Sequence, residues 1–486
     1  MAISWLDLFV LVAYLIGITL FGVRFRKSQH SLRDYFLGGR NLPWWAISLS
    51  VVSAETSILT IISTPGIAYR SNLAFLQLVF GYLVARVVVS FLLIPRYFCG
   101  EIYTAYQLIE LRFGKVLKVF TAFLFLGTRA LAEGVRVFAV ALVFQVVFKR
   151  GILASLLIVT CLTLFYTFEG GLAAVIWTDV IQLAIYLSGT VLALALVLHR
   201  IPGGWTTVQN IARVSGHKFA IFNFSFNWHN PYVFWAGFIG GTFLTSASHG
   251  TDQLIVQRLL AARNMRQSQA ALLSSGIVIL FQFALFLVMG VVLFSYYHFY
   301  PPPSAVGRAD MIFPYFVVHS LPPGLAGLLI AAIVAAGMAN LSSALNSLAS
   351  SSVVDFYKPF LRKSASEQHY LRVSRFLTLA WGGVLVALAL GIATFHRSVL
   401  EMALTIASVP YGSMLGIFLL GTLTTETRST SALIGALCGL GGLILVVKLT
   451  GIAWTWYVAI GATITFVVGW LAGRLQLAMQ HETMKM

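Results

Sequence analysis

The sequence predicts an all-α polytopic membrane protein. Of its 486 residues, 59% are hydrophobic and only 10% are charged, whereas a soluble chain carries about 25% charged residues. The mean hydropathy is +0.89, and apolar runs of about 20 residues, long enough to cross a bilayer core of about 30 Å, recur along the chain. Because these runs lack the alternation of a membrane β-barrel, each is expected to form a helix.

About thirteen such runs are expected to cross the membrane. They lie at about 4–24, 44–69, 73–97, 118–148, 151–168, 171–199, 232–257, 269–299, 323–354, 371–395, 398–423, 429–450 and 453–473. The first run has no Ala-x-Ala cleavage site and is followed by basic residues, which predicts a membrane helix and not a secretory signal peptide. The sequence contains no Gly-x-x-x-x-Gly-Lys-Ser/Thr loop, so transport driven by ATP hydrolysis within this chain is excluded.

The basic residues indicate how the helices are oriented. One set of alternate loops, with the C-terminus, holds 20 of the 32 Lys and Arg residues, and the other set holds 9. Because cytoplasmic loops retain positive charge, we expect the N-terminus outside and the C-terminus in the cytoplasm, in a plasma or cell inner membrane. The formal charge of +17 is therefore attributed to topology in the lipid bilayer, and no nucleic-acid partner is expected. Three scattered cysteines predict neither a disulfide framework nor a metal cluster.

The second run holds a carboxylate in mid-membrane, where ionisable groups are rare and usually functional. Glu55 is surrounded by small and hydroxyl residues, Ser48 to Ser57, and Pro65-Gly66 follows a few turns later. This composition predicts a discontinuous helix whose freed backbone carbonyls could coordinate a cation. The alternative is a serine-lined helix contact in which Glu55 pairs with an arginine.

Two further runs carry charged groups. Arg129, Glu133 and Arg136 share one helical face, and a self-neutralising triad is favoured over a role in gating or substrate binding. Asp179, which lies one turn before Gln182, either pairs with an arginine or provides a hard oxygen ligand for a small cation.

The seventh and ninth runs are also polar. Gly250 allows the seventh to leave the helical conformation, and His249 and Asp252 predict a polar-solute site or an Asp–His pair in preference to a metal site. The ninth, from Ala339 to Ser352, is dense in hydroxyl and amide oxygens. Neutral oxygen ligands near one carboxylate suit a dehydrated monovalent cation.

Taken together, these motifs resemble the sodium/solute symporter family, which includes the sodium/glucose, iodide and monocarboxylate cotransporters. The most specific motif is Phe-Tyr-Thr-Phe-Glu-Gly-Gly-Leu at 165–172, which leads into Trp-Thr-Asp-Val-Ile-Gln at 177–182. Supporting motifs lie at 35–40, 111–114, 252–253 with 256–258, and 346–347 with 355–357.

The resemblance implies a LeuT-like fold, in which two five-helix repeats of inverted topology surround a midplane site. The implied organisation is a leading helix and loop at 1–43, a first repeat at 44–200, an extracellular loop at 201–231, a second repeat at 232–424, and two trailing helices with a short tail at 425–486. The predicted breaks at Glu55 and His249 then open the two repeats, as expected for helices that form a transport site.

The resemblance also implies two sodium sites. At the first, backbone carbonyls match Ser53 and Thr56, and the ninth run contributes Ala336, Ala339 and Asn340. Ala339 stands where relatives have a hydroxyl, so this site is expected to be weakened or replaced by a proton. The ligands of the second site, found in some relatives, match Asp179, Ser342 and Ser343, all intact.

The predicted function is sodium-coupled symport of a small polar, sugar-like solute by alternating access, with no enzymatic activity and no obligatory protein partner evident. The candidate substrate contacts are Glu55, Gln77, Ser248, His249 and Asp252. A bare monocarboxylate is disfavoured unless Glu55 is protonated or paired with Arg86, Arg129 or Arg136. A polyhydroxy solute, or one that bears a cationic group, fits the donors and acceptors better. The alternatives are a proton-coupled symporter, an intramembrane enzyme that uses His249 and Asp252, and a channel, for which no repeated filter segment is found.

Overall fold

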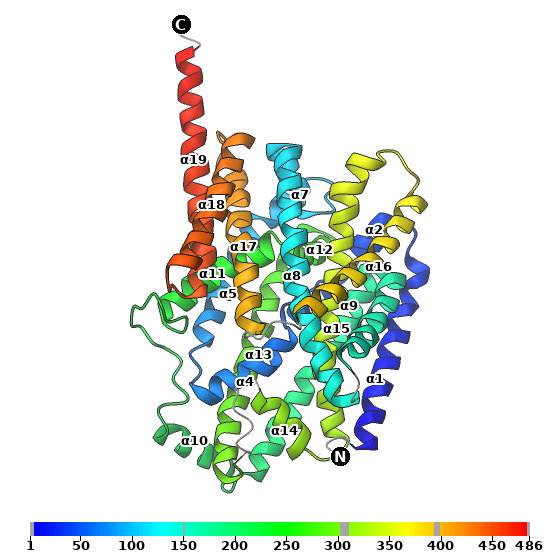
Figure 1. The fold of residues 1–486 in the computed structure, drawn as a ribbon, viewed down its shortest axis with the longest axis vertical. Coiled ribbons are helices and arrows are strands. Elements are labelled where there is room, and N and C mark those ends of the chain that lie inside the picture. Colours follow the sequence, from blue (N-terminus) through cyan, green and yellow to red (C-terminus); the bar gives the residue numbers. More distant parts are fainter. Residues whose placement is uncertain (1–3, 149–150, 302–310, 393–398, 484–486) are drawn as a thin grey trace.

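The computed structural model describes residues 4–148, 151–301, 311–392 and 399–483, and these residues form helices and connecting segments without a β-strand (Figure 1). The first half contains α1 (Trp5–Val23), η1 (Arg24–Ser28), α2 (Leu32–Leu37), η2 (Gly38–Arg40), α3 (Trp44–Glu55), α4 (Ile58–Arg70), α5 (Leu76–Leu92), α6 (Ile94–Tyr97), α7 (Ala105–Phe113), α8 (Lys115–Phe148), α9 (Ile152–Arg200) and α10 (Gly204–Val214). The second half contains α11 (Phe234–Gly250), α12 (Gln253–Leu260), α13 (Met265–Phe299), α14 (Ile312–Ser320), α15 (Leu325–Ser351), the π-helix η4 (Ser352–Leu361), α16 (Glu367–Ile392), α17 (Val399–Leu423), α18 (Ser429–Leu449), η5 (Trp454–Trp456) and α19 (Tyr457–Thr483).

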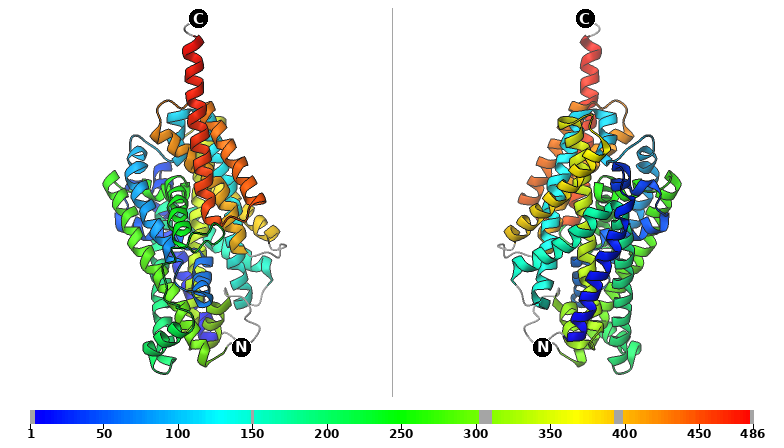
Figure 2. Two further views of the ribbon diagram at one scale, coloured as in Figure 1. Left: turned by 90° about the vertical axis from the view of Figure 1, so that its left-hand side faces the viewer. Right: turned by 90° about the vertical axis from the view of Figure 1, so that its right-hand side faces the viewer.

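The molecule is elongated, and many of its long helices run roughly along the long axis (Figures 1 and 2). The start of α1 and the end of α19 lie at opposite ends, and α19 projects beyond its neighbours. Among the described residues, seven helical segments are long and apolar enough to cross a membrane, and the bent pair α3–α4 makes an eighth candidate. The prediction of a helical multi-pass membrane protein is confirmed. The junction between the predicted runs 371–395 and 398–423 lies outside the described residues.

The predicted turn between the runs 151–168 and 171–199 is replaced by a kink within α9. Gly171 has φ 55° and ψ −155° inside the helix. A Cβ atom at Gly171 would lie 2.6 Å from the carbonyl oxygen of Tyr35, so glycine is required both by the backbone conformation and by the close approach of α2.

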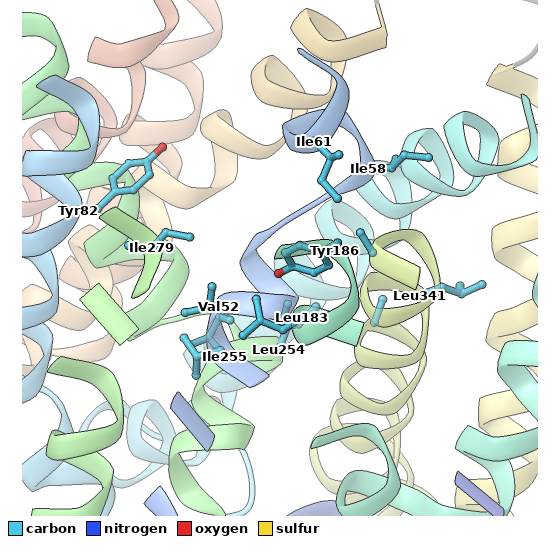
Figure 3. Packing of buried hydrophobic residues seen from close by; sticks show 14 of the residues in the cluster. Val52, Ile58, Ile61, Tyr82, Leu183, Tyr186, Leu254, Ile255, Ile279 and Leu341 are labelled. Carbon is cyan, nitrogen blue, oxygen red and sulfur yellow. The ribbon is translucent and has the colours of Figure 1, made fainter. Parts of the chain in front are cut away.

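Two predicted spans are broken near mid-length, as expected from their polar sequences. The axes of α3 and α4 differ by 67°, and Ser57 caps α4 by accepting a hydrogen bond from the backbone N–H of Thr60 at 3.2 Å. Similarly, α11 ends at Gly250, and Asp252 caps α12 by accepting from Leu254 N–H at 2.9 Å. Figure 3 shows Val52 and Ile58 on opposite sides of the first break. The breaks predicted at Glu55 and His249 are therefore confirmed, each within two residues.

Glycines bring the second broken span against α5. A Cβ atom at Gly81 would lie 2.3 Å from the carbonyl oxygen of Phe238, and one at Gly241 would lie 2.3 Å from that of Leu78. The two helices therefore pack backbone against backbone, as small residues allow in membrane proteins. This packing sets Arg86, further along α5, beside the end of α11.

The polar ninth run forms α15, which lies in the interior. In the most apolar stretch of this helix 89% of residues are buried, compared with 22–56% in the other candidate spans. Its serine and asparagine side chains therefore face protein and not lipid, where unsatisfied polar groups would be costly.

Candidate functional site

A cavity of about 210 Å³ lies beside the break between α3 and α4. Its walls also include α8, the broken pair α11–α12, α13 and α17. Its polar lining includes the charged or titratable residues Glu55, Arg129, Arg136 and His249, and the hydroxyl residues Ser57, Thr60, Ser63, Thr64, Ser248 and Ser408. Its aromatic lining consists of Phe75, Tyr82, Tyr232, Phe283, Tyr411 and Trp454. A mostly apolar wall with a few polar groups is typical of a small-molecule site.

The charge of Glu55 at this cavity is compensated. Its carboxylate forms a very short ion pair with Arg86 and lies 3.4 Å from Nε2 of His249. His249 in turn contacts Ser248 Oγ through Nδ1 at 2.9 Å. Arg86 is 1% exposed and also donates from Nε to Ser275 Oγ at 3.0 Å. Glu55 is thus paired with Arg86, and this pairing is the condition given above for a carboxylate substrate.

Asp252 does not pair with His249. Its carboxylate instead accepts short hydrogen bonds from Arg129 and from the hydroxyl of Tyr411. The expected Asp–His pair does not form because the helix is broken between the two residues, so the i, i+3 spacing no longer places them on one face. Asp252 therefore ties α12 to α8 and α17.

The predicted triad on α8 forms only in part. Arg136 contacts Glu133 at 3.1 Å, but Arg129 Nη1 lies 4.0 Å from Glu133 and has Asp252 as its main partner. The Arg136 side chain is 24% exposed and lines the cavity, whereas that of Arg129 is 7% exposed.

Asp179 is fully buried and pairs with an arginine, one of the two alternatives. Its Oδ2 accepts from Ser50 Oγ at 2.5 Å and from Nη2 of Arg258 at 2.9 Å. The same Nη2 makes a short hydrogen bond to Ser343. Oδ1 of Asp179 is buried and has no hydrogen-bond partner in the part of the chain that the structure describes. Ser342 lies beside Ser343 on α15 and donates to Ala339 O at 3.0 Å.

Arg258 is a site residue that sequence reasoning missed. The predicted run 232–257 ends just before it, which places Arg258 in a loop, but α12 continues to Leu260 after the break, and Arg258 is 1% exposed. Its position in the motif at 256–258, directly after a predicted helix break, could have identified it as a site residue.

The residues matched to the first sodium site also lie together. Nδ2 of Asn340 donates to the carbonyl oxygens of Thr56 at 2.7 Å and Ala336 at 3.1 Å. Over the described ranges, Oδ1 of Asn340 is buried without a hydrogen-bond partner. The amide nitrogen of Asn340 thus donates to one of the expected carbonyl ligands, Thr56 O, and also to the carbonyl oxygen of Ala336.

Gln77 does not line the cavity itself, but it contacts Tyr232, which does. It donates to the carbonyl oxygens of Ala74 and Tyr232, each at 3.1 Å, and accepts from Asn223 N–H at 2.9 Å. Its amide therefore holds the segment before α11 against α5.

Comparisons with known proteins agree with this architecture. The profile of the sodium:solute symporter family matches residues 35–439. The human sodium-coupled monocarboxylate transporter 1 is 30% identical over 418 residues, which cover 85% of this chain and 68% of that protein. The sodium/sialic acid symporter of Aliivibrio fischeri is 28% identical over 470 residues, covering 96% and 92%.

A solved structure is also similar over almost the whole chain. It is the substrate-bound outward-open state of a Na+-coupled sialic acid symporter, with a TM-score of 0.89 and 26% identity over 97% of this chain and 98% of that one. A nucleobase-cation-symport-1 family transporter shares the fold with a TM-score of 0.56 at 11% identity.

Proposed function

Because the chain belongs to the sodium:solute symporter family, whose members named above are transporters and not enzymes, we propose that it carries a small polyhydroxylated carboxylate across the membrane together with sodium. The observation that carries this proposal is the charge balance of the cavity. Glu55 is neutralised by Arg86, and the partly exposed guanidinium of Arg136, of which Nη1 contacts Glu133, has further N–H donors to offer a solute. Hydroxyl residues in the lining can pair with the hydroxyl groups of a sugar-like solute.

The names of the relatives support a solute of this class. One relative is named as a transporter of monocarboxylates and another as a symporter of sialic acid, and both of these solutes are acids. The earlier enzyme alternative has no support, because its two proposed residues, His249 and Asp252, have different partners.

Substitution Arg136→Gln tests the proposal. We expect it to raise the KM for pyruvate, glucuronate or sialic acid, whichever the native protein transports, by at least about tenfold, because hydrogen bonds to charged groups contribute about 1.5–3 kcal/mol. Uptake is measured in proteoliposomes with an imposed sodium gradient, with glucose included as the neutral solute. Arg200→Gln is the matched control, since Arg200 is exposed and bonds to the carbonyl of Ser320. A native protein that transports only glucose would contradict the proposal.

Sodium is the coupling ion of this family, and for this chain we propose that it binds at Asp179, Ser342 and Ser343. The unpartnered Oδ1 of Asp179 supports this site, because a buried carboxylate oxygen without a donor, among the residues described, suits a hard cation. At the first site, the Asn340 amide takes the place of an ion by donating to Thr56 O and Ala336 O.

Restoring hydroxyl groups should recover the first site. We expect the double variant Ala339→Ser/Asn340→Ser to carry an additional sodium ion per solute, because it frees the two carbonyl oxygens and adds hydroxyl ligands. The ratio of sodium to solute is measured from reversal potentials in proteoliposomes. Ala332→Ser, a buried alanine two turns earlier on α15, controls for adding a hydroxyl group to this helix. An unchanged ratio in the double variant would show that the amide does not replace an ion.

The remaining features of the architecture are also proposals. We propose thirteen membrane crossings with the N-terminus outside a plasma or cell inner membrane, and two inverted repeats at 44–200 and 232–424 between the leading segment 1–43 and the trailing segment 425–486, joined by the loop 201–231. The positions of the two broken pairs, α3–α4 and α11–α12, at the start of the two repeats support this division.

A further inference from the structure

Arg258 connects the second broken span to three other helices. The residue lies on α12, and its Nε donates to Ser50 Oγ of α3 at 2.8 Å. Its Nη2 donates to Asp179 of α9 at 2.9 Å and to Ser343 of α15. Its Nη1 donates to Leu254 O of its own helix at 2.6 Å. A fully buried guanidinium is thus bound mainly to groups outside its own helix.

The oxygens that Arg258 contacts overlap with the proposed sodium ligands. Both the guanidinium and the ion would use Asp179 and Ser343, and Asp179 supplies a single negative charge. The free Oδ1 of Asp179 gives an entering cation a first ligand. Two positive charges at one buried carboxylate repel each other strongly because the interior screens charges poorly. Sodium and the bound form of Arg258 therefore disfavour each other.

A symporter has to change its orientation both when it is loaded and when it is empty. In the empty state, a buried Asp179 without a partner would be costly to keep charged inside the membrane. The ion pair with Arg258 removes that cost, since both groups are within 1% of complete burial and 2.9 Å apart. The arginine can serve as the counter-ion whenever sodium is absent.

We propose that Arg258 is a tethered competitor of sodium, which neutralises Asp179 in the empty carrier and is displaced from this carboxylate when sodium binds. This inference rests on the proposed sodium site at Asp179. It assigns Arg258 a role in coupling: the residue lowers the affinity for sodium and permits the sodium-free return of the carrier.

The primary test uses sodium alone as the probe. The purified full-length protein and its Arg258→Gln variant are titrated with sodium chloride in nanodiscs, with choline chloride keeping the ionic strength constant, and binding is followed by thermal stabilisation. We expect the variant to bind sodium at least about fivefold more tightly, a typical size for coupling between two ligands. A residue that only supported Asp179 would produce weaker binding when it is removed.

A second readout separates coupling from stability. In proteoliposomes, with the carboxylate that the native protein transports, Arg258→Gln should slow net uptake while retaining exchange between sodium and solute present on both sides. Exchange does not require the empty carrier to return, so only net uptake depends on the arginine. An equal loss of both activities would overturn the proposal.

The adjacent residue of α12 provides a matched control. Nε2 of Gln257 donates to Phe36 O at 2.7 Å and is buried, so Gln257→Ala removes a contact of the same helix without touching Asp179. Its sodium affinity should equal that of the native protein. If Gln257→Ala tightens sodium binding as much as Arg258→Gln, loosening of α12 accounts for the effect and the competition is refuted.

Two additional variants keep the test decisive if Arg258→Gln does not fold. Arg258→Lys retains the charge but loses the forked contacts, and should tighten sodium binding to a smaller extent. Asp179→Asn/Arg258→Gln removes both charges, and should fold without responding to sodium. If Arg258→Lys binds sodium no more tightly than the native protein, the competition is refuted while the sodium site stands. A sodium response that persists in the double variant would instead overturn the site at Asp179.

Discussion

Replacing Asp179 with asparagine is expected to raise the half-saturating sodium concentration by at least about 30-fold and to abolish most sodium-driven uptake. At an effective dielectric constant of about 20, two unit charges about 4 Å apart interact by about 4 kcal/mol. Loss of half of that energy, about 2 kcal/mol, corresponds to about 30-fold in affinity. The amide still offers an oxygen to the ion, so the change reports on charge more than on shape.

The measurement is sodium-dependent uptake in proteoliposomes over a series of sodium concentrations. Asp7→Asn is a matched control, since Asp7 is another buried carboxylate, whose Oδ1 accepts hydrogen bonds from the N–H groups of Gly324 and Gly327 at 2.7 Å each. This control should lose heat stability but keep its sodium dependence. If Asp179→Asn has the sodium dependence of the native protein, Asp179 is only a structural partner of Arg258.

The features predicted most accurately from the sequence are those set by local chemistry. The break after Glu55 follows from a run of serine and threonine side chains that satisfy freed backbone groups, and Ser57 caps the next helix. The break before Gln253 follows in the same way from Gly250 and the Asp252 cap. In both spans, the residue types that disfavour a continuous helix are contiguous in the sequence.

Side-chain partners that lie far apart in the chain could be named only as alternatives. Three arginines were candidates for pairing with Glu55, and the choice of Arg86 depends on the close packing of α5 against α11. The partner of Asp179 lies 79 residues away on a helix that resumes after a break. A hydropathy pattern assigns residues to spans, but it contains no information on which faces of separate helices meet.

Breaking the buried pair between Glu55 and Arg86 is expected to cost the protein about 3–5 kcal/mol of stability. Glu55→Gln leaves Arg86 charged and only 1% exposed beside His249. Arg86→Met leaves the Glu55 carboxylate charged without its positive partner. The double variant Glu55→Leu/Arg86→Met should recover much of the loss, because well-packed apolar residues replace a buried ion pair at little cost. Thermal unfolding of purified protein in nanodiscs gives the stability change of each single variant and of the double variant, and from these the coupling energy between the two positions.

The pair between Glu426 and Arg474 provides a control for this cycle. Their side chains are 54% and 61% exposed, so Glu426→Gln should change stability by no more than about 1 kcal/mol. The alternative for Glu55 is direct contact with the hydroxyl groups of a solute. That role predicts a Glu55→Gln variant with native stability and mild loss of affinity, and a Glu55→Ala variant with severe loss. Neutralisation of Arg86 predicts instead that both variants are unstable, because each leaves Arg86 as the same uncompensated buried positive charge.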